Sequence, residues 1–175
     1  LILVAQDTAV YGIDIYGESR LDKLLEKLCQ IDGIQWIRLL YCYPENITDK
    51  TIKVMAENDK ILKYLDMPVQ HGSDTVLKRM GRRSTAELIK SKISSLRSLM
   101  PDIAIRTSII TGFPQESGEE FGELAEFVRE VRFDRLGVFT YSQEEGTPAA
   151  KMEGQIPEEI KQERKDIIMD MQRDI

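Results

Sequence analysis

The sequence has very few thiol and imidazole side chains, two of the common kinds of metal ligand. Its 175 residues include two cysteines, Cys29 and Cys42, and one histidine, His71. The cysteines are far apart and form no Cys-x-x-Cys pair, so these side chains cannot close a four-ligand structural site without carboxylates. We expect both cysteines to stay reduced and to pack as small core side chains, and we expect no metal ligand in this chain.

Long hydrophobic runs and an excess of positive charge are also missing. No apolar run is long enough to cross a bilayer and no signal peptide is recognisable, so we expect a cytoplasmic protein. The formal net charge of −6 argues against broad electrostatic binding of nucleic acid. The basic run at residues 78–83 is a local exception that we interpret as a solvated loop. No Gly-x-Gly-x-x-Gly follows the first strand, which leaves a dinucleotide-binding Rossmann fold with little support.

What the sequence does have is a regular alternation of strand and helix patterns. Short apolar runs predict five strands, and amphipathic stretches predict five helices. Strand starts lie roughly 30–40 residues apart, as in βα units, which predicts a parallel sheet covered by helices. The predicted strands are residues 1–5, 35–42, a run from residue 64, 103–110 and 135–141, and the predicted helices are 20–31, 48–58, 84–99, 117–131 and 157–175.

The number of strands predicts an incomplete barrel. The chain begins inside a strand, without a methionine, and five strands are one short of a six-stranded barrel. We therefore predict an α/β fold, a partial (βα)6 TIM-like barrel that lacks its first βα unit. Residues 1–155 form this core fragment, and residues 156–175 form a C-terminal helix. An open barrel edge exposes strand hydrogen bonds, so self-association through that edge is a further expectation.

Polar side chains gather where the predicted strands end. The run from residue 64 passes Pro68 and gives way to Gln70, His71, Ser73 and Asp74. A turn with a helix cap at Ser73 or Asp74 explains this segment alone, but the pattern recurs at other strand ends. Parallel strands bring their carboxyl ends to one edge, where ligand sites are built. That edge would gather Gln6, Asp7, Tyr41, Tyr43, Gln70, His71, Ser73, Thr111, Gly112, Tyr141, Ser142 and Glu144.

Three nearby residues each allow two interpretations. Arg106 lies in the middle of a strand, and it either binds an anionic group inside the barrel or pairs with a helix acid outside it. Glu116 either caps a helix or contacts ligand hydroxyls. Gly112 either lets the backbone approach a ligand or simply forms a turn. A conventional aldolase-like barrel has weak support, because Lys63 begins a strand where a catalytic lysine would end one.

Several strand ends carry motifs of a known family. These motifs lie at residues 5–8, 43–44, 68–74, 76–80, 112–116, 139–142 and 144–147. In order and nearly end to end, they resemble the radical S-adenosylmethionine methylthiotransferases. Gln-Asp-Thr, Gln-His-Gly-Ser and Glu-Glu-Gly-Thr resemble the branch that modifies an aspartate of a small-subunit ribosomal protein, and the branch that modifies an adenosine in transfer RNA is the alternative.

The resemblance implies a radical SAM barrel and its cofactors. It implies S-adenosylmethionine, a [4Fe–4S] cluster held by a Cys-x-x-x-Cys-x-x-Cys loop, an auxiliary cluster on an N-terminal domain, and a β-barrel domain after the C-terminal helix. This chain contains none of those cysteines, so we expect it to bind no cluster alone and to be inactive as a fragment. The implied activity of the longer enzyme is addition of a methylthio group to the β-carbon of an aspartate. An inactive scaffold or binding fragment is the alternative.

The resemblance also implies roles for the polar residues. The segments at 112–116 and 141–142 resemble those that line the adenosyl half of the cofactor, and Arg106 is a candidate for its carboxylate. Cofactor-binding residues are then Gln6, Gln70, Ser73, Arg106, Gly112, Glu116, Tyr141 and Ser142. The candidate substrate-binding residues are Asp7, Tyr43, His71 and Glu144.

Overall fold

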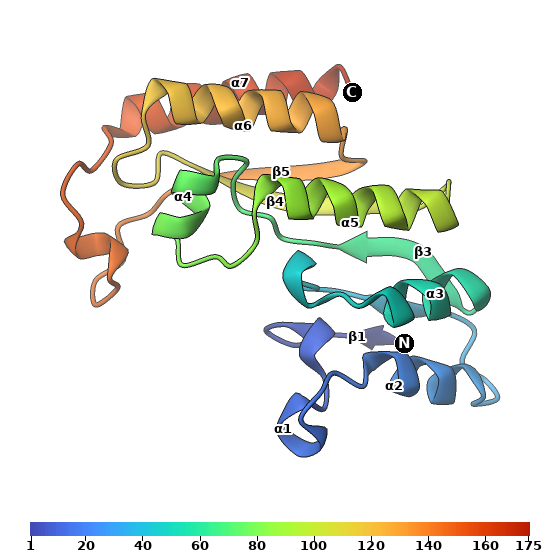
Figure 1. Cartoon of the computed structure of the whole chain (residues 1–175). Helices are drawn as coiled ribbons and strands as arrows, with labels where there is room; N and C mark the ends of the chain where they lie inside the picture. Colours follow the sequence, from blue (N-terminus) through green and yellow to red (C-terminus); the bar gives the residue numbers. More distant parts are fainter. The chain divides into compact units, whose positions relative to one another are not determined.

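The computed structural model describes all 175 residues, which form two compact units. The first contains Leu1–Pro68 and Leu88–Arg106, and the second contains Val69–Glu87 and Thr107–Ile175. Five parallel strands make one sheet in the order β1-β2-β3-β4-β5, with helices between them in the chain (Figure 1). The predicted α/β fold, a partial TIM-like barrel, is confirmed.

The first unit holds three strands and the start of a fourth. Strands β1 and β2 pair at Ile2 and Arg38, and β3 pairs with β4 at Tyr64 and Ala104. Its elements are β1 (Ile2–Leu3), a 3-10 turn (Thr8–Val10), α1 (Ile13–Tyr16), α2 (Leu21–Cys29), β2 (Ile37–Leu39), a 3-10 turn (Pro44–Asn46), α3 (Asp49–Glu57), β3 (Ile61–Asp66) and most of α5 (Ala86–Leu99).

The second unit packs two helices against the end of the sheet. Its elements are α4 (Asp74–Arg79), the later part of β4 (Ala104–Thr111), α6 (Gly118–Val131), β5 (Arg135–Thr140), a 3-10 turn (Ala149–Lys151) and α7 (Glu158–Arg173). Helix α6 begins with a capping box in which Ser117 and Glu120 satisfy each other's backbone amides. Helix α7 packs on both β5 and α6 (Figure 1).

Strand β4 shows how the sequence creates a covered face and an open face. Side chains alternate along it, so Thr107, Ile109 and Thr111 are buried while Ser108 and Ile110 are partly exposed. The buried set packs in the core. The partly exposed pair faces a cleft, which is described below.

Two short helices were not predicted. The segment between Tyr11 and Gly17, which lies outside the five predicted helices, contains α1, and the segment after Ser73 contains α4. Each has six or fewer residues, too few for a helical periodicity to be visible in the sequence. Pro68 lies in the interruption between the end of β3 at Asp66 and an isolated bridge from Gln70 to β4, a position where no regular strand hydrogen bond is needed.

Strand β1 is the outer strand of the sheet and carries exposed apolar residues. Leu1, Ile2 and Val4 are each more than half exposed, and so is Trp36 beside them in the first unit. Self-association through this edge therefore predicts a mass above that of a monomer in light scattering at high protein concentration. A monomer at every concentration would contradict it. No helix is both long and apolar enough to cross a membrane.

Candidate functional site

A cleft of about 550 Å³ opens beside the ends of β4 and β5 in the second unit. We call it the β4–β5 cleft. Its floor comes from the open face of β4, its sides come from the segment after β5 and from the loop after α4, and none of its lining residues is acidic. The lining residues are Gln70, Met80, Arg82, Ser108, Ile110, Phe113, Phe139, Thr140, Tyr141 and Ser142.

Gln70 is held in the cleft wall by its backbone. Its φ of 72° is left-handed, which is unusual for a residue with a side chain. Its amide donates to the Ser108 carbonyl at 2.9 Å, and its own carbonyl accepts from the Ile110 amide at 2.8 Å. The two bonds to β4 hold this strained conformation, a feature common at binding sites.

One end of the cleft is aromatic. The rings of Phe113 and Tyr141 meet edge to face with centroids 5.3 Å apart, and Phe139, which also lines the cleft, is 56% exposed. The Tyr141 hydroxyl is buried without a hydrogen-bond partner. A buried, unpaired hydroxyl in a cleft wall is a group that a polar ligand can satisfy. This end therefore suits a planar, partly apolar group with hydrogen-bonding atoms.

Arg82 supplies the charge of the cleft. It is the one cationic residue in the lining, and it comes from the loop after α4 together with Met80. Residues 78–83 are expected from the sequence to form a solvated loop, so Arg82 is a site residue that the sequence pattern does not reveal. A guanidinium in the same lining as Gln70 and Ser108 provides donors that match a carboxylate.

Behind the cleft lies a cluster of buried charged and polar groups that we call the Glu116 cluster. The amide of Ser73 donates to His71 Nδ1 at 2.9 Å, so that nitrogen carries no proton. His71 Nε2 is 3.3 Å from Glu116 Oε2, an electrostatic contact without good hydrogen-bond alignment. The same oxygen accepts from the Gly112 amide at 2.9 Å, and Arg164 donates to the other oxygen at 2.7 Å.

The partners of Glu116 determine its charge state. Burial raises the pKa of Glu116, but the contact with His71, the Gly112 amide and the Arg164 guanidinium outweigh it, and the net pKa lies below its ordinary value. The carboxylate is therefore charged at neutral pH. Both oxygens are used within the protein, so Glu116 holds the turn at Gly112 and is not free to contact a ligand.

Helix α7 fixes the same turn from the other side. The Lys161 ammonium donates to the Tyr141 carbonyl at 2.9 Å, and the Thr111 hydroxyl donates to the Lys161 carbonyl at 3.2 Å. Lys161 is 7% exposed, and its side chain lies so close to Gly112 that a Cβ there would be 2.2 Å from Lys161 Cγ. One helix thus positions the strand ends that border the cleft.

In the first unit, Asp7 organises two loops. One carboxylate oxygen accepts from the amides of Ala9 and Tyr43, at 3.0 and 3.2 Å, and the other accepts from the Asn46 side chain at 2.6 Å. Asp7, a predicted substrate-binding residue, is therefore already engaged by the protein. Gln6 beside it is exposed.

Arg106 has a partner that neither interpretation of the sequence anticipates. Its guanidinium donates to Asp66 on the adjacent strand β3 at 2.6 Å, and this bond raises the pKa of Arg106. Asp66 is 1% exposed, and its second oxygen accepts from the Tyr41 amide. The sequence does not reveal Asp66 as a partner of Arg106, because Asp66 looks only like the last residue of a strand.

The remaining predicted residues differ in exposure. The Ser73 hydroxyl is buried and has no hydrogen-bond partner, even though Ser73 is at the N-cap of α4. Ser142 lines the cleft and donates to Glu144 at 2.6 Å, and both side chains are exposed. Gln70, Tyr141 and Ser142 therefore line the cleft together, while His71, Ser73, Gly112 and Glu116 lie buried in the same unit.

The two cysteines do not form a metal site. Burial, and then the charges of Asp7 and Asp66, raise the pKa of Cys42 to about 12, so its thiol is protonated at neutral pH. Burial also raises the pKa of Cys29. No group of three or more His, Cys, Asp or Glu side chains is arranged to hold a metal ion.

Comparison with protein families identifies the fold. Residues 6–128 match the family model of the radical SAM superfamily, which is more than half of the chain. The chain belongs to the radical SAM superfamily. The matched region contains the β4 floor of the cleft, Arg82, and the His71, Gly112 and Glu116 members of the Glu116 cluster, but not Arg164.

Relatives within the superfamily point to one branch. The chain is 57% identical over its whole length to the ribosomal protein uS12 methylthiotransferase RimO of Clostridium perfringens, and 56% identical to that of Clostridium tetani. The RimO protein of Desulforamulus reducens is also 57% identical over the full chain. The chain spans 39% of the length of these relatives. The resemblance to the methylthiotransferases is confirmed.

Two solved structures share the fold. Coproporphyrinogen III oxidase (HemN) from Escherichia coli, a radical SAM enzyme, matches with a TM-score of 0.65 and 24% identity, over 87% of this chain and 34% of that chain. The radical SAM methyltransferase TsrM from Kitasatospora setae, solved with cobalamin and a [4Fe-4S] cluster, matches with a TM-score of 0.62 and 13% identity, over 79% of this chain and 27% of that chain. At these identities the likeness shows the fold alone.

Proposed function

We propose that the chain is the S-adenosylmethionine-binding core of a methylthiotransferase that modifies an aspartate β-carbon in ribosomal protein uS12. The whole-length identity of 54–57% to relatives with that name carries the proposal. In this proposal residues 1–155 form the barrel segment, and residues 156–175 form a helix that leads to a further domain. The site of action is the cytoplasm.

The β4–β5 cleft fits S-adenosylmethionine in size and chemistry. The aromatic end of the cleft and the unpaired Tyr141 hydroxyl suit the adenosyl group. Arg82, in the loop after α4, suits the carboxylate of the methionine half. Gln70, Ser142 and the backbone near Gly112 orient the ligand. The cofactor, when bound, supplies the radical chemistry that acts on an unactivated carbon.

The residues of this chain do not fit a [4Fe–4S] cluster. Such a cluster takes thiolate ligands, and this chain offers only Cys29 and the buried, protonated Cys42. We propose that the cluster ligands lie elsewhere in the longer protein, so the isolated chain is inactive. The roles proposed for this chain are cofactor binding and exclusion of water.

Two of the candidate substrate-binding residues, Asp7 and Tyr43, follow β1 and β2 in the first unit, and Gln6, a cofactor-binding candidate, lies beside Asp7. Glu144, a further substrate-binding candidate, follows β5 in the second unit. The acidic pair at residues 144–145 suits a basic ribosomal protein better than it suits the phosphates of transfer RNA. His71 and Glu116 support the binding residues from behind, because neither has an exposed side chain.

Arg82 and Arg106 are competing candidates for the cofactor carboxylate, and one experiment separates them. We expect Arg82→Met to weaken S-adenosylmethionine binding about tenfold, the size expected for one charge-assisted hydrogen bond. We expect Arg106→Met to have less effect, because Arg106 is not among the residues that line the cleft. Calorimetry with 5′-methylthioadenosine, which lacks the carboxylate, is the control and should show no change. Unchanged S-adenosylmethionine affinity in Arg82→Met would remove it from the site.

The activity itself is tested with the longer enzyme. The full-length protein, with its clusters reconstituted anaerobically, is incubated with uS12, S-adenosylmethionine, a sulfur source and a reductant. The expected result is a mass increase of one methylthio group on an aspartate-containing peptide of uS12. Modification of transfer RNA with no change in uS12 would favour the alternative substrate and overturn the proposal.

A further inference from the structure

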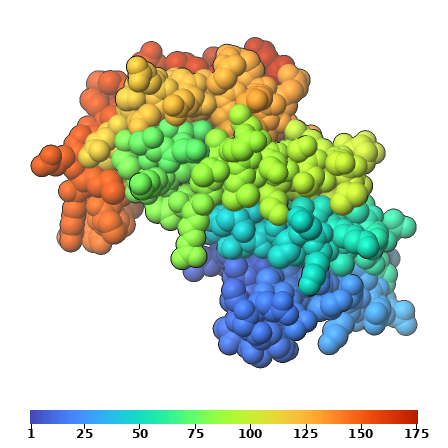
Figure 2. Space-filling view, in the orientation of Figure 1, coloured from blue at the N-terminus to red at the C-terminus, as the bar shows by residue number.

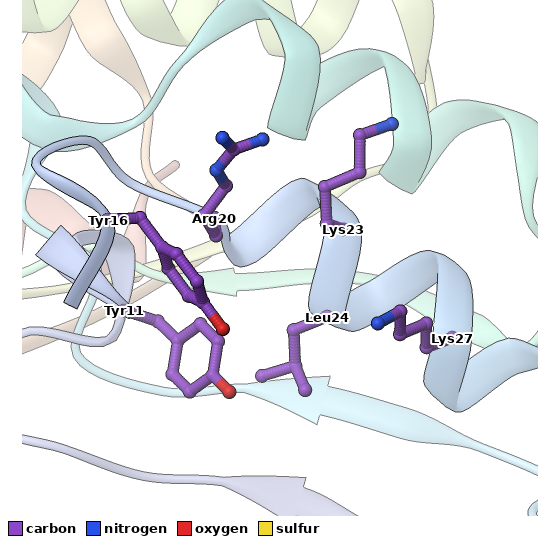
Figure 3. Close-up of a pocket in the computed structure, with 6 residues that line it drawn as sticks. All are labelled: Tyr11, Tyr16, Arg20, Lys23, Leu24 and Lys27. Atoms are coloured by element: carbon purple, nitrogen blue, oxygen red, sulfur yellow. The ribbon is translucent and has the colours of Figure 1, made fainter.

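A second pocket, separate in sequence from the cleft residues, lies in the first unit. It has a volume of about 310 Å³ and no acidic residue in its lining. We call it the tyrosine–lysine pocket (Figure 3). It is formed by α1, α2, the turn between them and Tyr11 just before α1, and its lining residues are Tyr11, Tyr16, Arg20, Lys23, Leu24 and Lys27.

Helix α1, beside this pocket, exposes apolar side chains to solvent. Gly12 and Gly17 flank α1 with φ values of 82° and 74°, and none of the four α1 residues is buried. Ile15 is 72% exposed and Tyr16 is 58% exposed. A Cβ on Gly12 would be 2.9 Å from the Tyr16 ring, so the glycine lets that ring lie against the backbone. An exposed apolar segment of this kind, beside a pocket, is typical of an interaction surface.

The charges around the pocket are mostly paired, with one exception. Arg20 pairs with Glu18 at 2.8 Å, and Lys23 pairs with Glu26 at 3.0 Å. Lys27 has no acidic partner. The pocket therefore presents one uncommitted positive charge.

The arrangement of donors suits a carboxylate on an aliphatic body. In Figure 3 the hydroxyl ends of Tyr11 and Tyr16 point toward Leu24 from one side, and the Lys27 amine points toward it from the other. Two phenol donors and one ammonium around a leucine match an acidic side chain next to an apolar one. Figure 2 shows the α1 segment, in dark blue, at the surface.

We propose that the tyrosine–lysine pocket binds a peptide segment of a partner protein in which an acidic residue is next to a large aliphatic residue. The acid pairs with Lys27 and accepts hydrogen bonds from the tyrosines, and the aliphatic side chain packs on Leu24 and α1. RNA fits less well, because its binding needs several uncommitted cations and the pocket has one. Helix α1 itself carries Asp14 between two isoleucines, so a second copy of the chain is the competing occupant.

The test is an amide NMR titration of the chain with the peptide N-acetyl-Leu-Glu-Leu-amide. We expect shifts at Tyr11, Tyr16 and Lys27, and affinity about fivefold weaker for the matched Leu-Gln-Leu peptide, as for the loss of one charged hydrogen bond. Lys27→Met should weaken binding of the Glu peptide by a similar factor. Lys151→Met, at an exposed position of the other unit, should leave that binding unchanged. Tyr16→Phe keeps the ring and removes the hydroxyl donor. Its affinity for the Glu peptide tests the proposal if Lys27→Met folds poorly.

Three results would overturn the proposal. The first is equal binding of the two peptides, or no binding of either. The second is a set of shifts at the pocket with a uridine hexanucleotide but not with the Glu peptide. The third is a set of shifts that depends on protein concentration and is abolished by Asp14→Asn, which would assign the pocket to a second copy.

Discussion

Replacing Glu116 by alanine is expected to lower the free energy of unfolding by about 3–5 kcal/mol, the cost of breaking a buried ion pair by removing one partner. The side chain of Glu116 has no exposed surface, and its loss leaves the Gly112 amide without its acceptor and the Arg164 guanidinium without its carboxylate partner. Urea denaturation of the chain measures the effect. The wild-type chain and the variant are compared at neutral pH.

Two further variants test whether the charge or the packing of Glu116 matters. Glu116→Gln keeps the shape and loses the charge, so we expect a smaller loss than for alanine. Glu126→Ala removes an acid of α6 that pairs with Arg129 at the surface, and we expect a change within about 0.5 kcal/mol. Equal stability of Glu116→Ala and Glu126→Ala would contradict the assignment of the Glu116 cluster as a structural centre.

The pH dependence of stability follows from the same carboxylate. The pKa of Glu116 in the folded chain is lower than its ordinary value, so its contribution to stability is present at neutral pH and is lost as the pH falls through the folded-state pKa. The wild-type chain should therefore lose stability below about pH 4 more steeply than Glu116→Gln. Denaturation curves for both chains at matched acidic pH values measure the difference.

The sequence predicts the fold well because its signals are local. Strand Ala104–Thr111 alternates buried and partly exposed residues, and the N-cap of α6 at Ser117 belongs to a capping box. Polar residues at strand ends also led to Gln70, Tyr141 and Ser142, which the structure brings into one cleft. Each of these features is defined by residues that are close together in the chain, so the sequence alone is enough to predict it.

The missing site residues depend on contacts that no local pattern encodes. Arg82 enters the cleft because the loop after the six-residue helix α4 brings it there, and a helix of that length leaves no periodic signal. Asp66 is paired with Arg106 across two strands, forty residues apart. Glu116 has a capping-type position in the sequence, but His71 and Arg164 determine its role, and both are remote in the chain.

Gly112→Ala is the second substitution with a large expected effect. The φ of Gly112 is 72°, a conformation that costs an L-residue about 1–2 kcal/mol, and the new Cβ would lie 2.2 Å from Lys161 Cγ. Overpacking of a buried site adds about 1–3 kcal/mol. The expected loss of unfolding free energy is therefore about 2–5 kcal/mol, measured by urea denaturation.

The matched control is the same substitution at Gly122, in α6, where a Cβ meets nothing within 4 Å. There alanine should raise stability by about 0.5–1 kcal/mol, because glycine is a poor helix former. If Lys161 is the obstacle at Gly112, the double variant Gly112→Ala, Lys161→Ala should lose less stability than the two single variants add up to. Strict additivity would show that left-handed strain alone sets the cost. A Gly112→Ala chain as stable as the wild type would instead mean that α7 can move away from the cleft, and that Lys161 does not fix the end of β5.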